Sequence, residues 1–261
     1  MNACVIAVVN QKGGVGKTTT VVNLAAGLAE LGRRVLIVDL DPQGNATMGS
    51  GIAKQALQQS GYQVLLGDAT IEQARQPAKQ GGYDVLPANR DLGGAELELV
   101  NELAREARLK NAITAVADQY NYVLIDCPPS LNLLTLNGLV AADSVLIPMV
   151  CEYYALEGLS DLVTTLRKVR VAVNPKIEIM GLLRTMFDSR SKLSQQVAEQ
   201  LARHFGDKVF DTVIPRNVRL AEAPSHGLPG LIYDRTSRGA QAYLALAQEL
   251  IGRLEPTTPS V

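Results

Sequence analysis

The sequence predicts an α/β fold in which a mostly parallel, twisted sheet is covered by helices on both faces. Short runs rich in β-branched residues alternate with longer stretches of helical periodicity along the chain. These runs are apolar throughout, as is typical of strands buried between two helical layers. The 261 residues, 47% of them hydrophobic, can bury one sizeable core, and no repeat or linker divides them. We expect one domain over residues 1–254 and a disordered tail at residues 255–261.

The expected strands are short apolar runs that end at polar or turn-forming residues. CVIAVV at residues 4–9 leads into a glycine-rich loop, RVLIV at 34–38 ends at Asp39, and YVLI at 122–125 ends at Asp126. The remaining expected strands lie at residues 83–86, 144–148, 177–183 and 208–214.

The expected helices are the longer periodic stretches between these runs. The first begins at Thr18, directly after the glycine-rich loop, and Gly32 ends it. The expected helices cover residues 18–31, 95–117, 157–171, 192–205 and 236–254. Residues 49–82 are rich in glycine and glutamine, so we expect a loop-rich excursion there.

Charge and cysteine content exclude several classes of protein. The net charge is −1, so any binding of nucleic acid must come from a local patch. The three cysteines, Cys4, Cys127 and Cys151, lie far apart and only two histidines are present, which argues against a zinc site or a disulfide framework. Reduced cysteines and the lack of a signal-peptide pattern favour a cytoplasmic protein. No apolar run reaches the roughly 18 residues that a membrane span needs.

The loop NQKGGVGKTTT at residues 10–20 predicts a phosphate-binding site. It departs from the strict pattern because Gln11 replaces the first glycine, but it lies between a strand and a helix, as a P-loop does. The glycines let backbone N–H groups point inward at phosphate oxygens, Lys17 would reach the β- and γ-phosphates, and Thr18 would place its hydroxyl on Mg²⁺. The expected nucleotide-binding residues here are Gly13, Gly14, Val15, Gly16, Lys17, Thr18 and Thr19.

Three carboxylates follow two of the expected strands. Asp126 ends one strand in the manner of a Walker B residue and would hold Mg²⁺ through water, while Asp39 and Asp41 follow another. The carboxyl ends of parallel strands share one edge of the sheet, so all three should lie beside the loop. A helix N-cap is the alternative role for any single one of them.

Five segments together resemble one family over residues 4–253. KGGVGKTTT, DLDPQGNAT, DCPPS, CEYYALEGL and VIPRNVRLAEAPSHG are similar to the ParA/Soj partitioning ATPases, which carry a deviant Walker A loop. The resemblance implies a P-loop ATPase, with ATP and Mg²⁺ as cofactors, that is slow alone and stimulated by a ParB/Spo0J-type centromere-binding protein. It also implies an ATP-dependent homodimer that binds nonspecific double-stranded DNA and associates with the nucleoid in the cytoplasm.

The resemblance assigns roles to further residues. Lys12 matches the signature lysine, which crosses the dimer to the other subunit's nucleotide, and Asp41 matches the aspartate that positions the attacking water. Lys12, Lys17 and Asp41 are thus the expected catalytic residues. The adenine would contact Pro215 and Asn217, with Met186 nearby, although Pro215 could equally be only a strand terminator.

The resemblance places DNA on a locally basic region. Residues 184–220 hold seven lysines and arginines and four acids, whereas residues 39–102 carry a net charge of −5. Arg190 and Arg219 are the best matches for DNA contacts, with Arg216 and Lys192 as weaker ones; for Arg203 and Lys208 a solvated charged face is the favoured interpretation.

Three other functions use a similar loop and stay open. A MinD-like membrane-associated ATPase needs a basic amphipathic C-terminal helix, but the apolar stripe at residues 240–254 favours a helix packed on its own core. An iron–sulfur carrier or reductase ATPase would need interface cysteines, for which Cys127 and Cys151 are candidates. A metabolic ATP-dependent ligase would need a substrate pocket that these motifs do not indicate.

Overall fold

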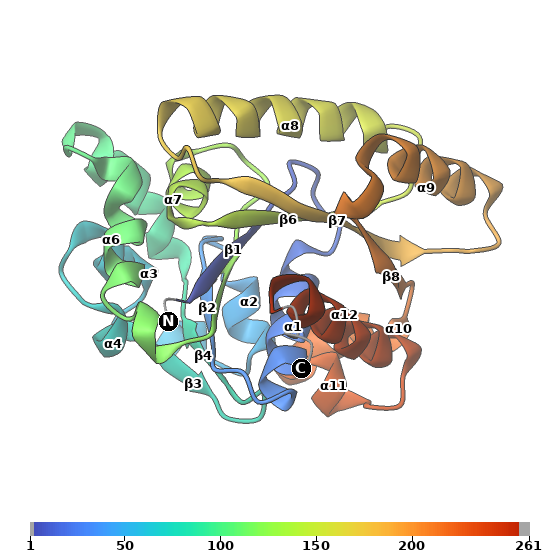
Figure 1. The fold of residues 1–261 in the computed structure, drawn as a ribbon. Helices are drawn as coiled ribbons and strands as arrows, with labels where there is room; N and C mark the ends of the chain where they lie inside the picture. Colours follow the sequence, from blue (N-terminus) through green and yellow to red (C-terminus); the bar gives the residue numbers. More distant parts are fainter. Residues whose placement is uncertain (1–2, 256–261) are drawn as a thin grey trace, which may run out of the picture.

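A twisted eight-stranded sheet runs through the part of the chain that the structure describes, residues 3–255 of a computed structural model (Figure 1). The strand order is β3-β4-β2-β5-β1-β6-β7-β8, and all neighbours are parallel except β3, which pairs antiparallel with β4. The strands are β1 Cys4–Val8, β2 Val35–Asp39, β3 Gln76–Ala78, β4 Tyr83–Leu86, β5 Tyr122–Asp126, β6 Ser144–Val150, β7 Glu178–Phe187 and β8 Val209–Pro215. The mostly parallel sheet predicted from the sequence is confirmed.

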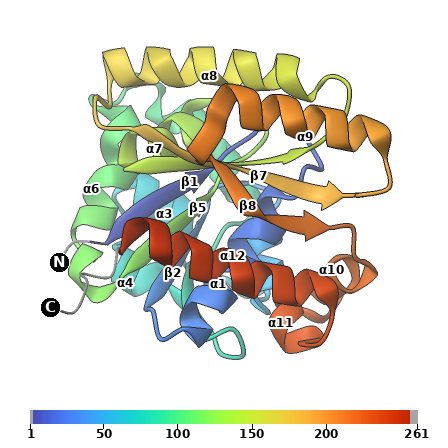
Figure 2. The same cartoon turned by 45° about the vertical axis from the view of Figure 1, so that its right-hand side comes forward.

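Helices cover both faces of this sheet. They are α1 Lys17–Glu30, α2 Asn45–Gly49, α3 Gly61–Leu66, α4 Ile71–Ala74, α5 Ala95–Glu98, α6 Arg108–Thr114, α7 Leu133–Ala141, α8 Ala155–Ala172, α9 Lys192–Phe205, α10 Val218–Glu222, α11 Gly230–Tyr233 and α12 Arg238–Leu254. Two buried clusters form the core, one between the sheet and the α6–α9 side, the other between the sheet and α1, α11 and α12. Figures 1 and 2 show these two layers above and below the strands.

The prediction of one helix over residues 95–117 is wrong. The chain there forms α5, short 3₁₀ segments and α6, and Ala104 takes a left-handed conformation with φ 52°. The break has a tertiary cause, because the Asn137 side chain of α7 donates to the Arg105 carbonyl (3.0 Å) and accepts from the Leu109 amide (3.1 Å). Local helix propensity cannot reveal such a bond from a distant element.

The segment expected to be a loop-rich excursion contains more regular structure than predicted. Within residues 49–82, α3 and α4 begin at capping boxes formed by Ser60 with Gln63 and by Thr70 with Gln73, and β3 adds an antiparallel edge strand. The sequence analysis also missed α7, whose N-cap is Asn132. These elements are short, so their periodicity is weak.

The C-terminal end joins the second core cluster. In α12 the side chains of Ala240, Tyr243, Ala247 and Leu250 are buried, as expected for a helix packed on its own domain. Glu255, where we expected a disordered tail to begin, accepts hydrogen bonds from Arg33 (2.6 Å) and Tyr122 (2.6 Å). The rest of that expected tail, residues 256–261, lies outside the described residues.

Candidate functional site

The loop between β1 and α1 has the geometry of a phosphate cradle. Gly14 (φ 73°) and Gly16 (φ 87°) occupy the left-handed region, which side chains with a Cβ rarely adopt, and Gly16 directly precedes the first turn of α1. The first amides of a helix have no intrahelical partner, so they can donate to an anion placed at this end. Thr185 of β7 supports the loop by donating to the Val15 carbonyl (2.8 Å).

The two lysines of the loop occupy different environments. Lys17 is only 8% exposed, and its ammonium lies 3.4 Å from the Lys12 carbonyl. Burial lowers the pKa of Lys17, while Asp126, Cys127 and Asp41 oppose that shift. The Lys12 side chain is half exposed and its Nζ pairs with Glu152 Oε2 at 2.5 Å, a partner that the sequence analysis did not foresee.

Asp126 is a buried carboxylate that is suited to bind a cation. It is fully buried, and neither of its oxygens has a hydrogen-bond partner among residues 3–255. Burial raises the pKa of Asp126 well above its usual range, and neighbouring Asp39, its register partner on β2, raises it further, while the nearby Thr18 hydroxyl and Lys17 oppose the shift. An unpartnered buried carboxylate is costly, so a metal ion at this position would fit the chemistry of the donor.

Asp39 organises the turn that carries Asp41. Its oxygens accept from the Thr47 amide (2.8 Å), the Thr47 hydroxyl (2.7 Å) and the Asp41 amide (3.1 Å). The Thr47 hydroxyl in turn accepts from the Ala88 amide (2.9 Å). The turn after β2 is therefore tied to the segment after β4, and the Asp41 carboxylate accepts only from Gln43 (2.9 Å) within the described chain.

The predicted adenine residues lie where β7 and β8 end. Met186 has a left-handed backbone (φ 47°), and its methyl group lies 3.9 Å from where a Cβ on Gly16 would stand. Pro215 ends β8 and is in register with Phe187. Asn217 caps α10, because its side-chain oxygen accepts from the Leu220 amide (3.2 Å), and its side-chain nitrogen donates to no group within residues 3–255. Strain at a non-glycine residue beside a glycine loop marks a candidate ligand site.

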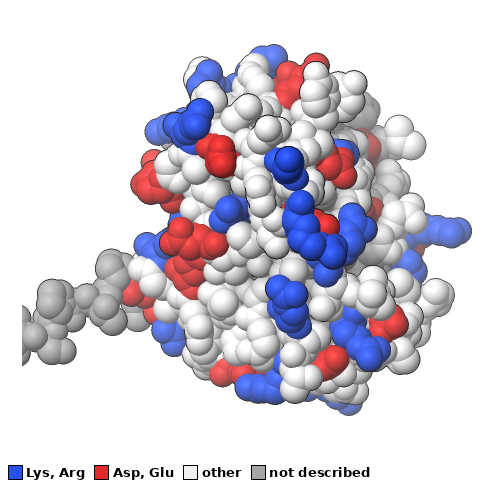
Figure 3. Space-filling view, turned by 90° about the vertical axis from the view of Figure 1, so that its right-hand side faces the viewer, with Lys and Arg blue, Asp and Glu red and all other residues white. Residues whose placement is uncertain are grey.

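The predicted DNA-contact arginines are already paired with carboxylates. Arg190 makes two bonds to Asp188 (3.0 and 3.1 Å), and Arg219 contacts Glu222 (2.9 Å) and Asp234 (3.4 Å). Figure 3 looks onto this side of the molecule, where basic side chains gather with acidic ones beside them. Within residues 3–255, neither Lys192 nor Arg216 forms an ion pair.

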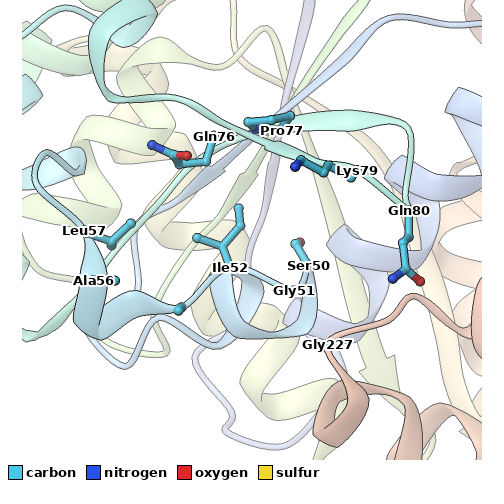
Figure 4. A pocket seen from close by; sticks show the side chains of 11 residues that line it. Ser50, Gly51, Ile52, Ala56, Leu57, Gln76, Pro77, Lys79, Gln80 and Gly227 are labelled. Carbon is cyan, nitrogen blue, oxygen red and sulfur yellow. The ribbon is translucent and has the colours of Figure 1, made fainter.

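A hollow of about 440 Å³ lies elsewhere, between the segment after α2 and the edge strand β3 (Figure 4). Ser50, Ile52, Gln76 and Lys79 line it, and Gly227 closes one end. None of the predicted nucleotide-binding residues reaches this hollow.

The cysteines and helices bear on the alternative functions. Cys127 and Cys151 are buried free thiols, and burial raises the pKa of Cys151 to about 11. Among the described residues, no group of three or more His, Cys, Asp and Glu side chains is arranged to hold a metal ion. The helices between residues 3 and 255 include none with the length and apolar character needed to cross a membrane.

This site has the features that define the class of P-loop nucleotide-binding proteins: a strand, a glycine loop with a buried lysine, a helix, and a buried carboxylate at a strand end. The family model described as "AAA domain" matches residues 3–179. The protein Soj of Bacillus subtilis is 56% identical over 94% of this chain and 97% of its own length. The chromosome partitioning protein ParA of Caulobacter vibrioides is 52% identical over 95% and 94% of the two chains.

A solved structure agrees in fold over almost the whole chain. The cobyrinic acid a,c-diamide synthase of Mycobacterium smegmatis, with bound ATP analogue and magnesium, has a TM-score of 0.86 and 39% identity, covering 98% of this chain and 97% of its own. The identities to Soj and ParA are higher and equally extensive. The chain therefore belongs to the ParA/Soj family of partitioning ATPases.

Proposed function

We propose that the chain is an ATP-dependent DNA-partitioning switch, in which an ATP-bound sandwich dimer binds nonspecific DNA until a ParB-type partner stimulates hydrolysis. The different placement of its two loop lysines carries the proposal. Lys17 is enclosed and serves its own loop, whereas Lys12 is half exposed and held only by a surface ion pair with Glu152. A surface pair of this kind is worth about 0–1 kcal/mol, so Lys12 can leave it for the nucleotide of a second copy.

ATP and Mg²⁺ fit the groups that the site presents. The loop amides and Lys17 would hold the phosphates, while Thr18 and, through water, Asp126 would hold the metal. Bound Mg²⁺ neutralises phosphate charge. Asp41, with one amide donor and a turn fixed by Asp39, would orient the attacking water. Lys12 of the second copy would stabilise charge that develops in the transition state.

Exposed aromatic side chains support a dimer that uses this edge of the sheet. Tyr153 and Tyr154 follow Glu152 directly, are largely exposed, and contact each other edge to face with ring centroids 5.0 Å apart. Aromatic residues are enriched where proteins associate. Their position beside the Lys12–Glu152 pair supports a surface that is covered when the second copy arrives.

The basic face supports DNA binding that depends on assembly. Arg190 and Arg219 are the proposed principal contacts, with Arg216 and Lys192 beside them. In one copy the two principal arginines are neutralised by carboxylates, so a phosphate must displace these partners. A dimer doubles the number of phosphate contacts, and DNA affinity depends steeply on that number. This would confine the ATP-bound form to the nucleoid.

Several observations favour this function over the alternatives. A MinD-like membrane role needs an available amphipathic C-terminal helix, but the apolar side of α12 is buried against α1 and β8. A cluster carrier needs accessible cysteines, and Cys127 and Cys151 are buried. The likeness to the cobyrinic acid a,c-diamide synthase would suggest a biosynthetic ligase, but Soj and ParA are more similar to this chain in sequence.

The proposal is tested by ATPase rates measured with and without DNA and with and without a ParB-type centromere-binding protein. We expect a slow basal rate, and a marked rise only when the partner and DNA are both present. A high basal rate that neither addition changes would contradict the switch.

A further inference from the structure

A groove runs between α8 and α9, away from the nucleotide site. Two hollows of about 460 and 450 Å³ share Val163, Arg167 and Phe205, so they form one continuous depression. The shared floor is apolar, with Val163 of α8 and Phe205 of α9 only partly buried. Figures 1 and 2 show α8 and α9 side by side above the sheet. We call this depression, lined by those two hollows, the α8–α9 groove.

Cationic side chains line the α8–α9 groove. Arg167, Arg170 and Lys208 are exposed, while Glu178 is its one acidic lining residue. The ion pairs found within residues 3–255 involve none of the three cations. An apolar floor with unpaired cations beside it is complementary to a segment that is both apolar and acidic.

Such a segment exists in the same chain, at residues 96–103, which we call the acidic tip. Its sequence ELELVNEL carries Glu96, Glu98 and Glu102. One oxygen of Glu96 is buried, so Glu98 and Glu102 are the exposed acids of the tip. Glu98 accepts from the Tyr62 hydroxyl (2.5 Å), and Glu102 pairs with Arg108 (2.6 Å) at the surface. Leu97 is 79% and Leu103 92% exposed, whereas Leu99 between them is buried in the core and anchors the tip. Large apolar side chains this exposed, next to acids, indicate a contact surface rather than a solvated loop. This tip lies in the stretch that the sequence predicted as uninterrupted helix.

The acidic tip and the α8–α9 groove of one chain lie on opposite flanks of α8. Val100 of the tip shares a hollow with Thr165 and Val169, whereas the groove uses the flank that carries Val163 and Arg167. The helix itself separates the two surfaces, so a chain cannot fill its own groove with its own tip.

We propose that the acidic tip of one chain docks into the α8–α9 groove of a second copy. Leu97 and Leu103 would cover the apolar floor. Glu98 and Glu102 would exchange their surface contacts with Tyr62 and Arg108 for Arg167, Arg170 and Lys208. The contact joins two different surfaces, so it either repeats from copy to copy or is made twice in a reciprocal two-fold pair. It uses neither Lys12 nor bound nucleotide, which makes it distinct from the proposed sandwich dimer. Its small area places it among weak, transient contacts.

The test is sedimentation velocity of the nucleotide-free chain, measured over a concentration series that extends to the solubility limit at low salt. We expect the weight-average sedimentation coefficient to rise with concentration, and the rise to shrink when salt screens the charges. Arg167→Glu and Glu98→Lys should each weaken association by about tenfold or more, because like charges then face each other. Lys168→Glu is the matched control, since Lys168 adjoins Arg167 on α8 but lines neither hollow.

Mixing the two charge-reversal variants gives the sharper result. Each variant alone brings like charges together, whereas the mixture allows two favourable contacts. The unaltered tip of Arg167→Glu meets the unaltered groove of Glu98→Lys, and the acidic groove of Arg167→Glu meets the basic tip of Glu98→Lys. The mixture should therefore associate more strongly than either variant alone. Leu103→Ser should weaken association and Val171→Ser should not, because Val171 is similarly exposed (87%) but lies outside the groove. A wild-type chain that stays monomeric throughout, or association that survives both charge reversals, would overturn the proposal.

Discussion

Two regions of the molecule differ in how their charged side chains are paired: the nucleotide edge, formed by the loop at residues 10–20 with Asp39, Asp41 and Asp126, and the basic face, which carries Arg190, Lys192, Arg216 and Arg219. At the nucleotide edge Asp126 is fully buried and its oxygens have no hydrogen-bond partner in the described chain. On the basic face Arg190 is exposed and bonded twice to Asp188. The nucleotide edge thus holds a carboxylate without a cationic partner, whereas the basic face holds a guanidinium that is already paired with a carboxylate. The difference teaches that Asp126 can bind a cation without giving up a protein partner, whereas Arg190 must give up Asp188 to bind a phosphate.

The largest effect is expected at Lys12, which belongs to the nucleotide edge but is exposed. Lys12→Ala should keep nucleotide binding, because Lys17 and the loop amides stay in place, and should lower stimulated ATP turnover by about 10³–10⁵-fold, as removal of an arginine finger does. Fluorescent-nucleotide binding and phosphate release measure the two quantities. Lys12→Arg is the matched control for charge alone, and wild-type turnover in Lys12→Ala would refute the proposed role.

Asp41→Ala separates assembly from hydrolysis. Without the carboxylate that would orient water, ATP should persist and an ATP-bound dimer should accumulate, while Asp39 and Thr47 keep the turn in place. Size-exclusion chromatography with ATP reports the dimer, and Asp68→Ala, a surface change, serves as control. A profile showing only monomer would count against the assignment.

Arg190→Ala tests the basic face directly. Each dimer would lose two phosphate contacts, so the slope of log affinity against log salt should fall by about 2 and affinity by roughly tenfold or more. Lys110→Ala, an exposed change on α6, is the control. Filter binding with ATP over a salt series measures both quantities, and an unchanged slope would remove Arg190 from the DNA surface.

Asp188→Asn should change DNA binding in the opposite direction and by less. The substitution frees Arg190 from its carboxylate, so DNA affinity should rise a few-fold in the ATP-bound form. The same filter assay detects it, with Asp161→Asn on α8 as control. Weaker binding would show that Asp188 orients Arg190 for DNA rather than competing with it.

A smaller effect is expected on stability at the nucleotide edge. The pKa of Asp126 is raised in the folded chain, so the folded state holds the proton more tightly and loses stability as pH rises above the carboxyl group's unfolded pKa. Asp126→Asn should therefore raise the melting temperature of the nucleotide-free chain at neutral pH by about 2–4 °C or more. Calorimetry of the wild-type chain and of Asp126→Asn at acidic and neutral pH checks this. Equal melting temperatures of the two chains at neutral pH would contradict it.

The sequence predicted the parts of this molecule that depend on local pattern. The order of buried strands, the glycine loop and the strand-end carboxylates were all predicted from neighbouring residues, and the parallel sheet confirms the predicted fold class. What it missed depends on distant partners. The Lys12–Glu152 pair joins residues 140 positions apart, and the break after α5 is held by Asn137. The Thr47–Asp39 network likewise needs Ala88, which lies in the segment after β4, 41 positions from Thr47.

The central claim is that ATP joins two copies through Lys12 and thereby creates a DNA-binding dimer. Its most direct test is DNA binding of the wild-type chain and of Lys12→Ala, each measured with ATP, with ADP and without nucleotide at several salt concentrations. The account predicts salt-sensitive binding by the wild-type chain only with ATP, and its loss in Lys12→Ala. Equal binding without nucleotide, or undiminished ATP-dependent binding by Lys12→Ala, would contradict it.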